Sequence, residues 1–190
     1  MKIQHAKSVL CDSKEYIFEF ITTKNQYLKS YPVLIKATEI LCRDMGSDAI
    51  PAIAHLVYGW MPTILKSYDF EGKSNALIFQ ALDIQDVLEA HAFIQKFTSS
   101  PVNNSMVGLS KVLHFINPEF FPIWDRRVAK HFGIHSHSQI QRIENYLQYM
   151  KFVEAHAEHL VVRQVQKTFL EKTKVHISTT RACEFILFMS

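Results

Sequence analysis

Lys111 and Asp125 are two ionisable residues that lie 14 positions apart, in the stretch of the chain best suited to carry chemistry. Apolar residues flank Lys111, and we expect them to keep water away from its amine. Desolvation lowers the pKa of an amine and makes it a usable nucleophile. Asp125 stands at the start of a short helical pattern, where its carboxylate can face backbone N–H groups and stay ionised.

An amine beside an ionised carboxylate is suited to cleaving a glycosidic bond. The carboxylate stabilises the positive charge that grows on the sugar carbon, and either the amine or a water molecule attacks that carbon. Three cations follow on the same expected helix, where they can hold phosphate groups together with the N–H donors of the helix N-terminus: Arg126, Arg127 and Lys130.

The elements that must position these residues are helices. The chain has only 5 Gly and 6 Pro in 190 residues, which argues against a turn-rich sandwich or barrel. Apolar residues recur at helical spacing through most of the chain, and residues 174–177 are the only short candidate for a strand. We therefore predict a compact all-α globule of about eight to ten helices.

Four of the expected helices bear on the site. One covers 104–116 and carries Lys111, and a short one runs from Asp125 to Phe132. A long helix is expected from 136 through about 154. The helix at 179–189 is so apolar that it must pack inside the protein.

Other boundaries are marked by Pro and Gly. Pro32 lies where a helix can begin, and Gly46 where that helix can end. We treat 1–190 as one all-α domain, in which two helical lobes, 1–100 and 101–190, can share a cleft.

The order of these residues resembles that of the helix-hairpin-helix superfamily of DNA glycosylases, particularly its small bacterial 8-oxoguanine glycosylase-like branch. In that superfamily a glycine-containing hairpin leads into a helix with the catalytic lysine, and a Pro-[Ile/Val]-x-Asp-like element places the catalytic aspartate at the start of the next helix. Gly108 and Lys111 fall in the first element, and Pro122-Ile123-Trp124-Asp125 is similar to the second. The hairpin keeps one glycine of the usual two, and the Lys-to-Asp interval is shorter than usual.

The resemblance implies an all-α DNA glycosylase that excises a damaged base, with Asp125 stabilising charge and Lys111 acting as a Schiff-base nucleophile. It implies DNA rather than RNA as the partner. The sequence has no cysteine cluster for an iron–sulfur centre, and we predict no cofactor. The implied contacts to nucleic acid come from Gly108, Trp124, Arg126, Arg127 and Lys130. The aromatic stretch 58–62 is expected near the base pocket, because such enzymes stack an extruded base on aromatic rings.

Two other functions fit the same sequence. Arg126 and His131 have the Arg-x4-His spacing that resembles the motif of HEPN-type ribonucleases, in which Arg neutralises phosphate charge and His moves a proton. The chain can also be a helical binding module that kept the fold and lost the chemistry.

Composition adds broader constraints. Residues 101–190 carry 11 Lys and Arg against 7 Asp and Glu, which suits a polyanionic partner. The three cysteines form no CxxC, and the histidines at 131, 135 and 137 are interrupted by Gly133, so neither a disulfide framework nor a metal site is predicted. No signal peptide and no membrane span are evident, so we expect a cytoplasmic protein whose oligomeric state stays open.

Overall fold

The computed structural model describes residues 3–11, 16–22, 24–61, 64–68 and 72–190. These residues form helices and no strand, with one isolated antiparallel bridge between Tyr68 and Val102. The α-helices are α1 Ile3–Cys11, α2 Tyr16–Phe20, α3 Gln26–Met45, α4 Ile50–Trp60, α5 Gly72–Phe79, α6 Val87–Ile94, α7 Met106–Ile116, α8 Arg126–His131, α9 His137–Ile140, α10 Ile143–Ala155, α11 Leu160–Thr173 and α12 Thr179–Met189, and short 3-10 helices cover Gly46–Ala49 and Gln80–Asp83.

The all-α prediction is confirmed. Nine α-helices of the described residues have eight or more residues, and the other three have four to six. Residues 174–177, the strand candidate, are irregular and lead from α11 into α12.

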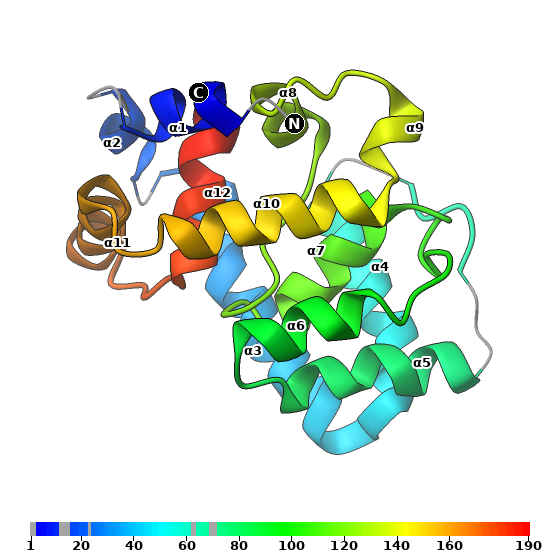
Figure 1. Ribbon diagram of the computed structural model, residues 1–190. Coiled ribbons are helices and arrows are strands. Elements are labelled where there is room, and N and C mark those ends of the chain that lie inside the picture. Colours follow the sequence, from blue (N-terminus) through cyan, green and yellow to red (C-terminus); the bar gives the residue numbers. More distant parts are fainter. Residues whose placement is uncertain (1–2, 12–15, 23, 62–63, 69–71) are drawn as a thin grey trace.

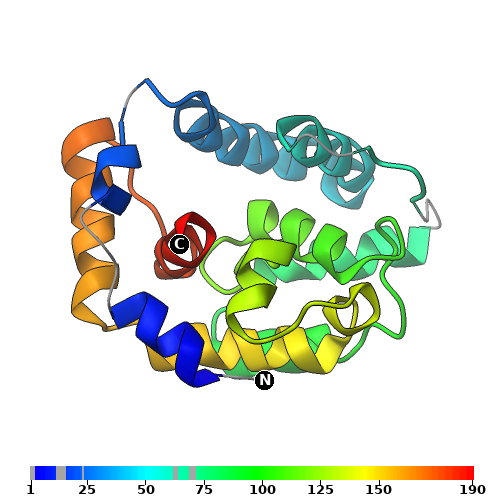
Figure 2. The same cartoon turned by 90° about the horizontal axis from the view of Figure 1, so that it is seen from above.

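The last helix, α12, forms the centre of the fold. Its residues from Thr180 to Leu187 are all buried, as predicted for 179–189. It packs against α1, α8, α10 and α11, and seen from above it lies in the middle of the other helices (Figure 2). The polar side chains between Thr180 and Leu187 are therefore brought into the interior.

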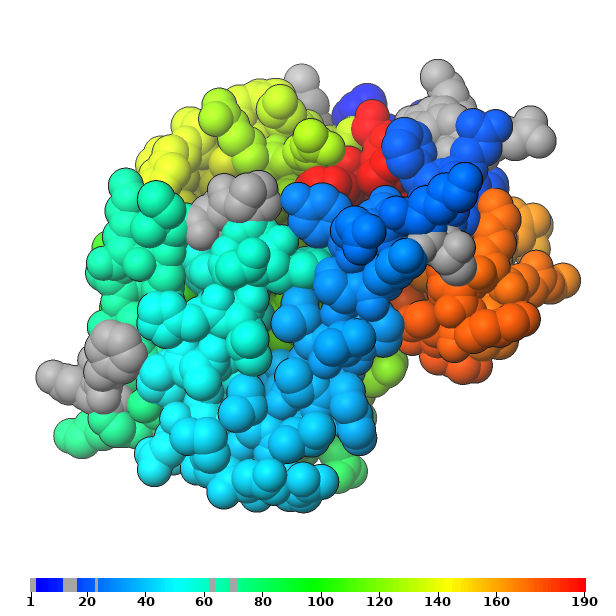
Figure 3. Space-filling view, turned by 180° about the vertical axis from the view of Figure 1, so that it is seen from behind, coloured from blue at the N-terminus to red at the C-terminus, as the bar shows by residue number. Residues whose placement is uncertain are grey.

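The remaining helices enclose α12 and α7. Helices α1 and α8 pack on each other and on α12 at one end of the molecule, and α5 lies at the other end (Figure 1). Helices α3 and α4 run side by side, both pack on α7, and together cover much of one face, blue and cyan in Figure 3. The site residue on α7, Lys111, thus lies in the interior, whereas α8 lies at the surface with its exposed cations.

Helix α3 begins earlier than predicted. Asn25 caps it by accepting the N–H of Tyr27 at 3.0 Å, so Pro32 lies inside the helix and does not start it. A proline inside a helix removes one backbone hydrogen bond. The buried side chains of Leu28 and Tyr31, which lie before Pro32, keep this first part of α3 on the core. The predicted end at Gly46, with a φ of 59°, is confirmed.

The predicted helix from 136 to about 154 is divided into α9 and α10. The indole N–H of Trp124 donates to the carbonyl of Ile140 at 2.9 Å, at the end of α9. The side chain of Gln141 accepts the N–H of Met106 at 2.6 Å. These tertiary bonds hold the chain in the short non-helical connection before α10 begins at Ile143.

Gly108 permits a close approach of three segments. It lies in the first turn of α7, where Ser105 caps the helix by accepting its N–H. A Cβ atom at 108 would overlap the hydroxyl of Tyr58 on α4 and would lie 2.8 Å from the carbonyl oxygen of Val102. The glycine is therefore required by packing rather than by backbone conformation.

Replacing Gly108 by alanine is expected to lower the free energy of unfolding by about 1–3 kcal/mol, because the added methyl group overpacks this contact. Gly59→Ala is the matched control: position 59 lies inside α4, where an added Cβ atom would meet no other atom within 4 Å. That change is expected to stabilise the protein by up to about 1 kcal/mol, because alanine favours helix more than glycine does. Urea denaturation of both variants measures this, and equal effects would refute the packing role of Gly108.

Candidate functional site

Ser110 ties α7 to the segment that carries Asp125. Its hydroxyl accepts the backbone N–H of Trp124 at 3.0 Å, and both residues are fully buried. The ring of Trp124 also packs on Tyr149, with 5.1 Å between ring centroids. Because Lys111 follows Ser110 and Asp125 follows Trp124, these contacts fix the two candidate catalytic positions relative to each other.

Asp125 is the N-cap of α8, as predicted. Its Oδ1 accepts the N–H of Val128 at 2.8 Å, and the residue is partly exposed. A capping carboxylate stabilises a helix by about 1 kcal/mol. Its second oxygen accepts no hydrogen bond from the described residues, so Asp125 can meet a ligand while it caps the helix.

Lys111 lies at the inner side of the same junction, with only 8% of its surface exposed. Burial lowers the pKa of its amine, in the direction that the sequence predicts, and the charge of Asp125 partly opposes this effect. The two side chains are thus close enough for their charges to interact. The amine is largely desolvated, whereas the carboxylate is partly exposed at the start of α8.

The interior also holds a charged pair that was not predicted from the sequence. Arg181 and Glu184, 7% and 3% exposed, form an ion pair on α12. The guanidinium lies 5.0 Å from the ring centroid of Tyr31 and 5.9 Å from that of Trp60. The sequence does contain a signal for this pair. Arg181 and Glu184 are three residues apart in a segment whose apolar residues already predict a buried helix, so the two charges are expected to pair inside the protein.

His114 adds a neutral partner to this cluster. Its Nδ1 lies 2.7 Å from the carbonyl oxygen of Phe121, which can only accept, so Nδ1 carries the proton. Its Nε2 then accepts the hydroxyl of Tyr31 at 2.8 Å. Burial, followed by the charge of Arg181, lowers the pKa of His114 to about 3, and burial raises the pKa of Tyr31 to about 12.

The three cations of α8 remain accessible. Arg126 and Arg127 are exposed, and so is Lys130. Arg126 and Lys130 are four residues apart and therefore share a face of the helix. The guanidinium of Arg127 lies 4.7 Å from the ring centroid of Phe188 on α12, which supports its orientation.

Two residues predicted to contact nucleic acid lie in the interior. Trp124 has no exposed surface, and its indole N–H is already bonded to Ile140. Gly108 is buried against Tyr58 and Val102. Both act on the geometry of the site through packing, so the prediction of direct contact is corrected for these two positions. Of the aromatic stretch, Trp60 is partly buried beside Arg181, and Pro62 lies outside the described residues.

Arg126 and His131 do not share a face of α8. Five residues correspond to a rotation of about 140° on an α-helix. The imidazole of His131 instead lies against that of His5 on α1, with 5.7 Å between ring centroids, and burial lowers its pKa. Within the described part of the chain, no group of three or more His, Cys, Asp or Glu residues is placed to hold a metal ion.

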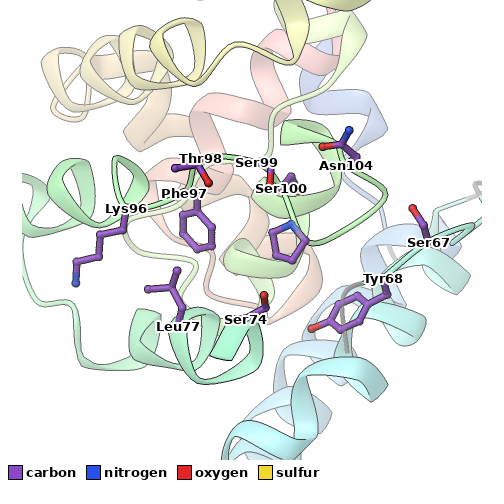
Figure 4. Close-up of a pocket in the computed structure, with 11 residues that line it drawn as sticks. Ser67, Tyr68, Ser74, Leu77, Lys96, Phe97, Thr98, Ser99, Ser100 and Asn104 are labelled. Atoms are coloured by element: carbon purple, nitrogen blue, oxygen red, sulfur yellow. The ribbon is translucent and has the colours of Figure 1, made fainter. Parts of the chain in front are cut away.

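A separate cavity of about 550 Å³ lies between α5, the end of α6 and the loop before α7 (Figure 4). Hydroxyl groups dominate its wall, but Tyr68 donates to Asn75 and Ser100 to the carbonyl of Val102. Lys96, the one charged residue among the described residues that line it, lies at the opposite end from Tyr68. This cavity does not include Lys111 or Asp125.

Searches of family models, curated proteins and solved structures find no match to this chain. None of the helices in the described ranges combines the length and the apolar character that a membrane span requires.

The state of His114 predicts how stability depends on pH. Its pKa is about 3 in the folded protein and about 6.5 when unfolded, so the unfolded chain binds the extra proton between these values. The contribution of His114 is complete above pH 6.5 and is lost by about 1.4 kcal/mol per pH unit as the pH falls from there toward 3. Urea denaturation at about pH 7.5, 6.5, 5.5 and 4.5 measures the slope. The His114→Gln variant should lack this part of it, and parallel curves for the two proteins would contradict the assignment.

Proposed function

We propose that this protein is a DNA glycosylase that excises a damaged base, with Lys111 and Asp125 as its reacting groups. The observation that carries the proposal is the buried amine of Lys111 at the junction where Ser110 binds the backbone of Trp124 next to Asp125, and where α8 presents exposed cations. Desolvation makes the amine nucleophilic. The partly exposed carboxylate offers negative charge on the side from which a substrate would arrive.

In the proposed reaction the free amine of Lys111 attacks C1′ of the damaged nucleotide. The C1′–N bond breaks, its electron pair leaves with the base, and the base takes up a proton. The attached Nζ loses a proton, and opening of the sugar ring gives an imine between Nζ and C1′. Asp125 stabilises the positive charge on the sugar carbon during bond cleavage.

The cations of α8 would hold the DNA backbone. Arg126 and Lys130 share one exposed face of the helix, next to the Asp125 cap. Such residues bind phosphates without reading sequence, and they place the target nucleotide rather than recognise the base. A base inside a duplex must be extruded before C1′ becomes accessible to Lys111.

Borohydride trapping on duplex DNA that contains an oxidised purine tests the reaction. The wild-type protein is expected to give a covalent adduct, since borohydride reduces the imine to a stable amine. Lys111→Gln should abolish the adduct, and Asp125→Asn should slow base release at least about tenfold, as expected when a charge-stabilising group is removed. Lys73→Gln, on the exposed start of α5, is the matched control and should leave both unchanged.

Three outcomes would change the proposal. Full base release by Lys111→Gln without an adduct would assign the attack to water rather than to the lysine. An Asp125→Asn variant that alters stability alone would indicate a binding module without catalysis. RNA cleavage that is lost in His131→Ala would favour the ribonuclease.

Salt dependence tests the proposed DNA interface. Each phosphate contact that is removed is expected to reduce the slope of log affinity against log salt concentration by about one. Lys130→Gln should therefore weaken binding to undamaged duplex DNA at low salt and flatten this slope, as measured by fluorescence anisotropy. Lys73→Gln serves again as the control, and equal slopes for the Lys130→Gln and wild-type proteins would exclude Lys130 from the interface.

A further inference from the structure

The cavity beside α5 has the size of a small-molecule site and a polar wall. Its volume of about 550 Å³ lies within the range of about 300–1,000 Å³ that ligand sites occupy. Three segments form the wall: residues 67–68, helix α5, and residues 96–104 between α6 and α7 (Figure 4). Most of the polar positions are Ser, Thr or Asn, which offer hydrogen bonds without charge. Such a wall favours a polar ligand.

Several polar side chains of this wall have no partner within the protein. The hydroxyl groups of Ser67, Thr98 and Ser99 and the amide of Asn104 form no hydrogen bond with any described residue. The hydroxyl groups of a sugar both donate and accept, so they can satisfy such side chains. Phe97, which also lines the cavity, offers an apolar surface for the C–H groups of a sugar ring.

Lys96 adds one positive charge at an end of the cavity, opposite Tyr68 (Figure 4). Its side chain is exposed, and its ammonium lies 5.6 Å from the ring centroid of Phe93. In the described ranges it forms no ion pair with an acidic residue. A lysine binds phosphate as a point charge through charge-assisted hydrogen bonds. One cation fits a single phosphate group, whereas a nucleic acid backbone is bound by several.

The loop that carries these groups is held in one conformation. Asn103 and Asn104 both have left-handed backbone, with φ of 54° and 46°. The Asn103 side chain accepts the N–H groups of Lys66 and Ser67 at 2.7 and 2.9 Å. It also donates to the carbonyl of Ile64 at 3.0 Å. Left-handed conformations of residues other than Gly persist where surrounding contacts enforce them. Two sides of the cavity are thus joined before a ligand arrives, and binding requires little ordering.

We propose that this cavity binds a small phosphorylated sugar, with Lys96 on the phosphate and the hydroxyl groups of Thr98 and Ser99 on the sugar. Inorganic phosphate would use only the Lys96 end of the cavity, and an uncharged sugar would leave that cation without a partner. A ligand that carries both groups matches the whole wall. The cavity includes neither Lys111 nor Asp125, so this inference does not rest on the proposed function.

Ribose 5-phosphate is the probe, and the backbone amide signals of residues 96–104 report its binding in a two-dimensional NMR titration of the full chain. We expect saturable shift changes in this segment, with a dissociation constant of about 1 mM or lower. Ribose and inorganic phosphate should each bind at least about tenfold more weakly, because each lacks one set of contacts.

Two variants separate the contributions of charge and hydroxyl groups. Lys96→Gln should weaken the binding of both ribose 5-phosphate and inorganic phosphate at least about tenfold, since both lose the charge-assisted bond. The double variant Thr98→Val/Ser99→Ala should weaken ribose 5-phosphate about tenfold and leave inorganic phosphate unchanged. Lys167→Gln, on the exposed face of α11, removes the same charge away from the cavity and should change neither. All these positions are exposed, and the same spectra report whether each variant is folded.

The titration can overturn the inference in three ways. Absence of saturable shifts, or equal binding of ribose 5-phosphate and inorganic phosphate, would exclude a sugar phosphate as the ligand. Equal affinity of Lys96→Gln and the wild-type protein would refute the role of the lysine. Tighter binding of a 5′-phosphorylated oligonucleotide to this segment would assign the cavity to a nucleic acid instead of a small molecule. The titration needs no damaged base, so failure of borohydride trapping would refute the glycosylase reaction and leave this result standing.

Discussion

Burial of charge on the central helix is the constraint on which the surrounding structure depends. An unpaired guanidinium costs several kcal/mol when it leaves water, and a buried ion pair recovers this only with good geometry and further contacts. Glu184 provides the pair, and the rings of Tyr31 and Trp60 provide weakly polar faces. His114 lies in the same interior and stays neutral, because burial, and after it the charge of Arg181, lower its pKa.

The same interior determines the properties of Lys111 and Asp125. The chain leaves α7 at Ile116, reverses through residues 117–124, and returns to α7 where Trp124 bonds to Ser110. This return explains how two residues only 14 positions apart, Lys111 and Asp125, come to lie at one junction of the chain. Lys111 faces inward and is desolvated, whereas Asp125 caps α8 at the boundary with solvent.

Local signals predicted much of this arrangement. The apolar run at 179–189 predicted a buried helix, and Asp125 was identified as a cap because its residue type and the following helical pattern agree. Helix α7 begins two residues later than expected, after the Ser105 cap. These features depend on residues within one or two helical turns of each other. Such residues are close in the sequence, so the features could be predicted from it.

Long-range contacts account for what the sequence did not reveal. Trp124 was expected to face nucleic acid beside a basic helix, but it fills the core and divides α9 from α10 by bonding to Ile140. The start of α3 depends on Asn25 rather than on Pro32. The contacts of Arg181 with Tyr31 on α3 and Trp60 on α4 join positions far apart in the chain, and no periodicity encodes them.

The division of α8 into an inner and an outer side gives the proposed reaction its physical basis. Exclusion of water makes a lysine a better nucleophile, whereas exposed cations are what attract a DNA backbone. Val128 and Ala129 bury one side of this helix, while Arg126 and Lys130 leave the other in solvent. Asp125 lies at the end where the two sides meet. A carboxylate at that boundary can act on a charge that develops on a substrate arriving from solvent and on the amine behind it, and neither a fully buried nor a fully exposed carboxylate could do both.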